Sequence, residues 1–208
     1  MDIELYTFFL VTTVMLILVP GPAAITVAKQ AASHNTKLTF LSVLGVASAD
    51  ALFFILSATG IASLIVASNL VFSIIKWFGV AYLMFLGVSA ILSKAGPIKI
   101  DAQLTTMNPS KAFSHGLVIQ LANPKALMYF SALLPQFVDP KEPIILQMIL
   151  MGLTCFLADL VVYSLFGRMG AQLARKQVKS WVINLINKAA GTALIATGIK
   201  MVTLENTK

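Results

Sequence analysis

Apolar residues along this 208-residue chain gather into long runs that short polar stretches separate. The runs are about 20 residues long or longer, the length a helix needs to cross ~30 Å of hydrocarbon. We therefore expect an all-α polytopic membrane protein with six transmembrane helices. The predicted spans are about Leu5–Ala31, Leu38–Ile65, Leu70–Leu92, Phe113–Phe137, Ile144–Phe166 and Val182–Val202.

Prolines interrupt two of these predicted spans, as Pro20-Gly21-Pro22 in the first and Asn123-Pro124 in the fourth. A proline inside a helix removes a backbone donor and frees the carbonyl four residues earlier, at about 3 kcal/mol or more. At membrane depth such groups persist only where protein buries them or where they line a wet cavity. The breaks therefore predict a binding site, although prolines that only kink their helices are the simpler alternative.

Composition supports the membrane assignment, because 58% of the residues are hydrophobic and only 11% are charged. That leaves too few charges to cover a soluble domain of this size. The formal net charge is +7, but the bases are spread over short loops and form no stripe that nucleic acid would need. We expect the lipid bilayer, and no nucleic acid, as a partner.

Charged residues alternate between the predicted loops. Short loops rich in Lys and Arg stay on the cytoplasmic side of a membrane. The basic loops lie between spans one and two, three and four, and five and six: Lys29, Lys37, Lys94, Lys99, Lys111, Arg168, Arg175, Lys176 and Lys179. Together with the acidic start at Asp2 and Glu4, this pattern predicts that both termini lie outside the cytoplasm.

The two halves of the chain carry similar features in the same order. Each half has a proline break, then an intramembrane aspartate, then an apolar string with a glycine at each end. The aspartate and the string are Asp50 and 79–87 in the first half, and Asp159 and 191–198 in the second. Three spans per half reverse the direction of the second half, which predicts an inverted repeat with its site near the bilayer midplane. We expect one transporter domain over 1–208, with repeats at about 1–93 and 112–208 and a cytoplasmic loop at about 94–111.

Each break can create an anion site, because a helix that restarts presents free N–H groups and the positive end of its dipole. Asn123 can cap the second restarting helix through its side-chain oxygen, and Lys125 adds a cation. A substrate carboxylate would suit both ends; the alternative is that Lys125 only pairs with Asp159. The predicted substrate-binding residues are Pro20, Gly21, Pro22, Ala23, Asn123, Pro124 and Lys125.

Asp50 and Asp159 are the predicted coupling residues. An ionised aspartate at the bilayer centre costs about 2.5–3.5 kcal/mol on insertion scales, so each must be paired, hydrated or protonated. Burial favours the neutral carboxyl and a substrate ammonium favours the charged one, so proton and amine compete, which is a physical basis for antiport. The alternative is a structural ion pair with Lys76, Lys188 or Lys125.

Catalytic, metal and cofactor sites are not expected. His34, His115 and Cys155 make no metal-ligand cluster, which argues against a metal ion as cargo. A membrane-embedded enzyme would need a nucleophile with its base or a His-Glu-x-x-His motif, and the sequence has neither. Glycines within the spans predict close helix packing and permit a homodimer without requiring one.

The Pro20-Gly21-Pro22 motif, the 45–50 stretch, the 79–87 string and Asn123-Pro124-Lys125 together resemble the lysine exporter (LysE) superfamily over essentially the whole chain. Within it, the chain resembles the branch of the homoserine and threonine resistance exporters. The resemblance implies a carrier in the bacterial cytoplasmic membrane that exports amino acids or close derivatives, driven by the proton gradient. Family members usually follow Pro-Gly-Pro with asparagine, where this chain has Ala23, so the resemblance leaves the substrate open.

Overall fold

Helices make up most of the described part of the chain in this computed structural model, which describes residues 2–32, 35–67, 69–93, 108–173 and 180–205. The predicted loop at about 94–111 lies mostly outside them. The elements are α1 (Ile3–Leu18), α2 (Pro22–Ala32), α3 (Thr36–Ala67), α4 (Asn69–Leu92), α5 (Pro109–Leu121), α6 (Pro124–Met128), a π-helical turn (Tyr129–Leu133), a 3-10 turn (Leu134–Phe137), α7 (Ile144–Leu173) and α8 (Ser180–Glu205). The all-α prediction is confirmed.

Both proline-containing spans are bent. α1 and α2 meet at 57°, and α5 meets the segment 124–137 at 55°. Val19 is extended, with φ −64° and ψ 111°, because the residue before a proline is pushed out of the helical region. α2 and α6 then restart with Pro22 and Pro124 at their first positions, where the missing N–H costs no hydrogen bond.

Several helices are long and apolar enough to cross a membrane. Within the described residues, three meet this test alone, and five do so when each bent pair counts as one span. The sixth expected span is α4, of which 80–92 is a shorter apolar helix. The polytopic fold agrees with the sequence, whereas the count of six spans and the inverted relation of the halves stay predictions.

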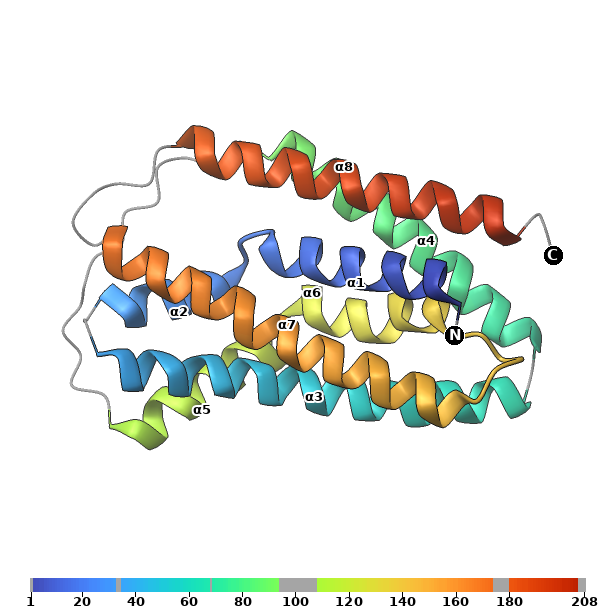
Figure 1. Cartoon of the computed structure of the whole chain (residues 1–208), viewed down its shortest axis with the longest axis horizontal. Helices are drawn as coiled ribbons and strands as arrows, with labels where there is room; N and C mark the ends of the chain where they lie inside the picture. The colour runs from blue at the N-terminus through green and yellow to red at the C-terminus, as the bar shows by residue number, and fades with distance from the viewer. Residues whose placement is uncertain (1, 33–34, 68, 94–107, 174–179, 206–208) are drawn as a thin grey trace.

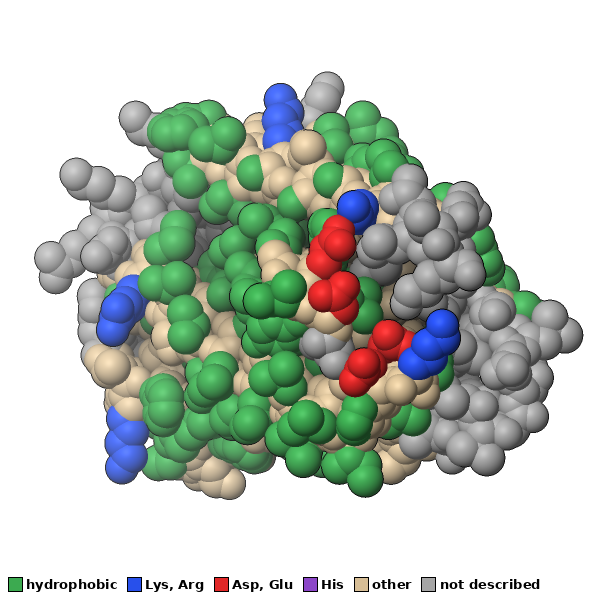
Figure 2. Space-filling view, turned by 45° about the vertical axis from the view of Figure 1, so that its right-hand side comes forward, with side chains coloured by type: hydrophobic (Ala, Val, Ile, Leu, Met, Phe, Trp, Pro, Cys, Tyr) green, Lys and Arg blue, Asp and Glu red, His purple; other side chains and the backbone are tan. Residues whose placement is uncertain are grey.

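Lipid-facing side chains are clearest on α7. Every fourth residue there exposes a large apolar side chain: Ile149, Leu153, Leu157, Val161 and Leu165 are 46–60% exposed. Figure 2 shows hydrophobic side chains over most of the described surface that faces the viewer. An apolar stripe of this length suits hydrocarbon and would be unfavourable in water.

The helices pack in layers, with α4 and α8 together on one side and α3, α5 and α7 on the other (Figure 1). α1 contacts both α7 and α8, and α2 packs on α7. The two termini lie at the same end of the molecule, and α2 ends, and α5 begins, at the opposite end. Helix α1 therefore lies between these two groups of helices, and at its break residues 19–21 are half-buried whereas Pro22 is exposed.

Two glycines bring α3 and α5 into backbone contact. A Cβ on Gly45 would collide with the carbonyl oxygen of Phe113, and one on Gly116 with that of Ser42. Small residues allow this approach in membrane helices. The contact holds α3 and α5 together one to two turns before Asp50 and Gln120, so it helps to place these two polar residues side by side.

We expect Gly45→Ala to destabilise the fold, because the added methyl group meets backbone that cannot move aside. Overpacking of this kind costs about 1–3 kcal/mol. Gly60→Ala on the same helix is the matched control, since nothing lies within 4 Å of a Cβ there, and alanine favours helix. Thermal unfolding of purified protein in detergent measures both. Equal unfolding temperatures for the two variants would contradict the packing.

Candidate functional site

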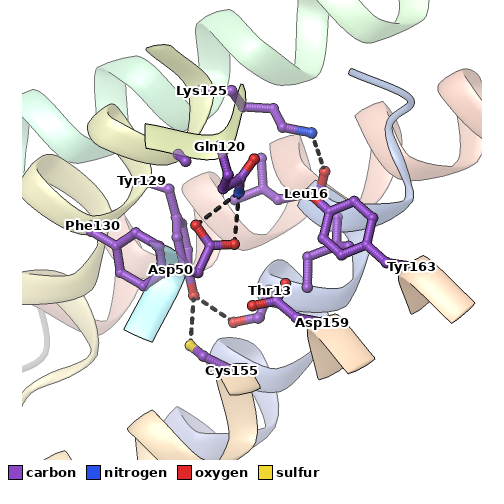
Figure 3. A pocket seen from close by; sticks show the side chains of 12 residues that line it. Thr13, Leu16, Asp50, Gln120, Lys125, Tyr129, Phe130, Cys155, Asp159 and Tyr163 are labelled. Atoms are coloured by element: carbon purple, nitrogen blue, oxygen red, sulfur yellow. Dashed lines mark hydrogen bonds between the residues drawn. The ribbon is translucent and has the colours of Figure 1, made fainter. Parts of the chain in front are cut away.

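A small pocket lies where the two broken spans meet α3 and α7 (Figure 3). Polar side chains from five α-helices line it: Thr13 on α1, Asp50 on α3, Gln120 on α5, Lys125 on α6 and Asp159 on α7. The volume is about 30 Å³, which has room for about two water molecules. The pocket is therefore charged, buried and too small for an amino acid in this conformation.

Lys125 joins the two broken spans. Its amine donates to the carbonyl oxygens of Leu16, at 2.8 Å, and Val19, at 2.9 Å. The Leu16 carbonyl needs this donor because its usual partner four residues on is Pro20, which has no N–H. A cation at the C-terminal end of α1 also suits the helix dipole. Gly21 lies beside the amine, since a Cβ there would be 3.6 Å from Nζ.

A chain of hydrogen bonds runs from the start of α6 to Asp50. The Asn123 side-chain oxygen accepts from the backbone N–H of Lys125 at 3.1 Å, so the predicted cap is present. The Asn123 amide donates to Gln120 Oε1 at 3.0 Å, and Gln120 Nε2 donates to both carboxylate oxygens of Asp50 at 2.7 Å. The second break thus fixes one face of the Asp50 carboxyl.

Asp50 and Asp159 are neighbours in the pocket. They are 5% and 2% exposed, and each interacts electrostatically with the other and with the Lys125 amine. Lys188 is exposed, and the side chain of Lys76 lies outside the described part. The cation that faces the two carboxyl groups is therefore Lys125, held by carbonyls rather than by a direct salt bridge among the described residues.

Aromatic and hydroxyl groups close the far side of the pocket. The Tyr129 hydroxyl lies 2.6 Å from Thr13 Oγ1 and 3.8 Å from Cys155 Sγ. Tyr129 and Phe130 belong to the π-helical turn after α6, and such turns are frequent at functional sites. Tyr163, which is 2% exposed, lines the pocket on the other side of Asp50 (Figure 3).

The predicted site residues divide into three groups. Asp50, Asp159 and Lys125 line the pocket. Pro20, Gly21, Pro22, Asn123 and Pro124 shape the breaks around Lys125. Ala23 lies in an apolar cluster with Val43, Val46 and Tyr163, so it packs against α3 and α7 outside the pocket lining.

Sequence reasoning missed several lining residues, chiefly Gln120, Thr13, Tyr129 and Tyr163. Gln120 had a detectable signal, because it is a polar residue in an apolar run, one turn before Asn123. The hydroxyl residues had none, since Thr and Tyr are common in membrane helices. Among the residues that the structure describes, no three His, Cys, Asp or Glu side chains gather as a metal site.

The fold and the pocket define a polytopic helical membrane protein with broken helices around buried charges, an arrangement typical of secondary transporters. The sequence model of the LysE type translocator family matches residues 14–205. The chain belongs to this family of translocators, so it is not an enzyme.

Named relatives support the same class. A homoserine/homoserine lactone efflux protein of Salmonella typhimurium is 29% identical over 203 residues, which covers 95% of this chain and 96% of the relative. An uncharacterised membrane protein of Vibrio cholerae is 28% identical over 205 residues, which covers 99% of this chain and 100% of the relative. No solved structure matches the chain significantly.

Proposed function

We propose that this protein exports small amino acids, or close derivatives, across the bacterial cytoplasmic membrane in exchange for protons. One observation carries the proposal: Lys125, Asp50 and Asp159 meet in one buried pocket between two broken helices. The carboxylate of an amino acid can bind Lys125, and its ammonium group can bind Asp50 and Asp159. The family and the efflux relatives favour the same cargo.

Lys125 is the proposed carboxylate ligand. Its amine now caps two uncharged carbonyls of α1. A charge-assisted hydrogen bond to a carboxylate is roughly twice as strong as a neutral one, so substrate can displace these carbonyls. The exchange would release the end of α1 from α6, and the break would change shape as substrate binds.

Asp50 and Asp159 have different proposed roles. Gln120 donates to both oxygens of Asp50, and hydrogen bonds to a carboxylate favour its charged form. Two neighbouring carboxyl groups in a buried site do not both ionise readily, because like charges repel. We assign the negative charge, balanced by Lys125, to Asp50 as the ammonium ligand, and the exchanged proton to Asp159.

We infer that the conformation described is a closed one, because a pocket of about 30 Å³ does not admit an amino acid. The ends of the molecule differ in charge. Lys29, Lys37 and Lys111 lie on the segments that meet at one end, whereas Asp2 and Glu4 lie at the end with both termini. The positive-inside rule places the basic end in the cytoplasm.

The test is efflux from proteoliposomes that contain the purified protein and a mixture of amino acids. We expect loss of one or a few small amino acids, faster when the outside is made acidic than at equal pH, because inward proton flow drives export. Protein-free liposomes are the control. If folded protein releases no amino acid under either condition, the proposed function is wrong.

A further inference from the structure

A groove of about 400 Å³ lies between α3 and α7, at the basic end of the molecule. Each helix contributes every third or fourth residue, from Thr36 to Val43 on α3 and from Ser164 to Ala171 on α7. Residues with this spacing share one face of a helix. The volume is within the range of about 300–1,000 Å³ that is usual for ligand sites. The groove is therefore large enough for a bound molecule.

Small residues form the floor of the groove, and exposed residues form its rim. Ala31 of α2 is 4% exposed, and Gly167 is also buried. A Cβ on Gly167 would lie 2.9 Å from the Thr39 side chain, so α3 and α7 approach closely at that level. Phe40 and Arg168 are exposed. The groove is therefore closed toward the inside of the bundle by α2 and open on the outer surface, which lipid surrounds in a membrane protein.

The groove lies near the boundary between hydrocarbon and lipid headgroups. Asp50 and Asp159 are expected near the bilayer midplane. At about 1.5 Å per residue, Arg168 is about 14 Å beyond Asp159 along α7, and the stretch 36–43 is about 10–21 Å from Asp50 along α3. The hydrocarbon of one leaflet is about 15 Å thick. Arg168 thus reaches the headgroups, and the deeper part of the groove faces the start of the acyl chains.

Arg168 gives the groove its charge. No other described residue that lines the groove is charged, and among the residues described no acidic side chain forms an ion pair with Arg168. A guanidinium binds phosphate oxygens through two parallel hydrogen bonds, and Thr36 and Ser164 add hydroxyl groups. An ammonium headgroup would find no carboxylate partner in this lining. The groove therefore favours a phosphate whose negative charge is not balanced within its own headgroup.

Apolar side chains continue from the groove in two directions. Toward the interior, Val43 of the groove and Tyr163 of the charged pocket belong to one buried cluster, which separates the two spaces. Toward the midplane, Val161 and Leu157 of α7 are 60% and 58% exposed. Val161 is three residues before Ser164, so the two are neighbours on the helix surface. An occupant therefore reaches the groove from the membrane, and an acyl chain can lie along α7.

We propose that this groove binds an anionic phospholipid of the cytoplasmic leaflet. The phosphate lies on the Arg168 guanidinium beside the hydroxyl groups of Thr36 and Ser164, and an acyl chain follows the exposed apolar stripe of α7. Anionic lipids of the cytoplasmic leaflet attract basic residues near the membrane surface. Such a lipid links α3 to α7, the helices that carry Asp50 and Asp159. The inference does not depend on what the protein exports.

Native mass spectrometry of the purified full chain in detergent tests the site. The probes are dioleoyl phosphatidylglycerol, which is anionic, and dioleoyl phosphatidylcholine, which has the same acyl chains and no net charge. We expect the wild type to bind phosphatidylglycerol more tightly, and this affinity to fall about tenfold or more in Arg168→Gln, as for loss of a charged hydrogen bond. Ser164→Leu keeps the arginine but fills the groove, and it should also weaken binding.

Lys37→Gln is the matched control, because Lys37 is an exposed base at the same end of α3 that does not line the groove. It should bind phosphatidylglycerol like the wild type. Equal loss in Arg168→Gln and Lys37→Gln would show a general attraction to the basic end and overturn the inference. Unchanged affinity in Arg168→Gln or in Ser164→Leu would place the lipid elsewhere. Displacement of the lipid by excess inorganic phosphate would show a simple anion site, which also overturns the inference.

Discussion

Asp50→Asn should lower amino-acid export by up to roughly 100-fold, because a hydrogen bond to a charged group contributes about 1.5–3 kcal/mol. The substitution keeps the shape of the side chain and one of the two hydrogen bonds that Gln120 donates to it, but it removes the charge that attracts an ammonium. Asp159→Asn should act differently. We expect it to retain exchange of labelled for unlabelled amino acid at a reduced rate, and to lose acceleration by a pH gradient.

Counterflow and gradient-driven efflux in proteoliposomes separate these two effects. Asp139→Asn is the control, since Asp139 lies in the turn before α7, away from the pocket. If both pocket variants lose counterflow equally, the division of roles between the two carboxyl groups is wrong. Normal gradient-driven export by Asp50→Asn would remove Asp50 from the site.

Lys125→Met should impair both transport and stability. The change leaves the Leu16 and Val19 carbonyls without their donor, and each unsatisfied buried group costs about 1–3 kcal/mol. It also removes the proposed ligand of the substrate carboxylate, so we expect export to fall by roughly 100-fold. Efflux and thermal unfolding in detergent measure the two losses.

Lys188→Met is the matched control, because Lys188 is an exposed lysine on α8. It should transport and unfold like the wild type. To separate folding from binding, export by Lys125→Met is measured below its own unfolding temperature with the amount of folded protein matched. A folded variant that exports at the normal rate would show that Lys125 serves only to cap α1.

The sequence predicted the broken spans because proline acts locally. Pro20 and Pro124 fix φ and remove a donor wherever they stand, so the bends near Val19 and Asn123 follow from the residues alone. The same holds for the aspartates, since a charge inside an apolar run must find partners in the protein. These features predict that the two proline breaks, Asp50 and Asp159 lie at one level of the membrane.

The contacts of Lys125 could not be predicted in the same way. Its carbonyl partners are over 100 residues away in sequence, and only packing decides that they, rather than Asp159, receive the amine. Gln120 could not be predicted for a related reason, since one amide in an apolar helix can face lipid, a neighbour or a pocket. Ala23 was assigned to the site from its position beside Pro22, whereas the turn of α2 points it into the apolar cluster.

Proton movement coupled to amino-acid flow tests the central claim most directly. Proteoliposomes loaded with the exported amino acid and a pH-sensitive dye are diluted into amino-acid-free buffer at equal pH. We expect the interior of wild-type vesicles to acidify as the amino acid leaves, and Asp159→Asn vesicles not to acidify. Amino-acid efflux from wild-type vesicles without any change of internal pH would contradict exchange for protons.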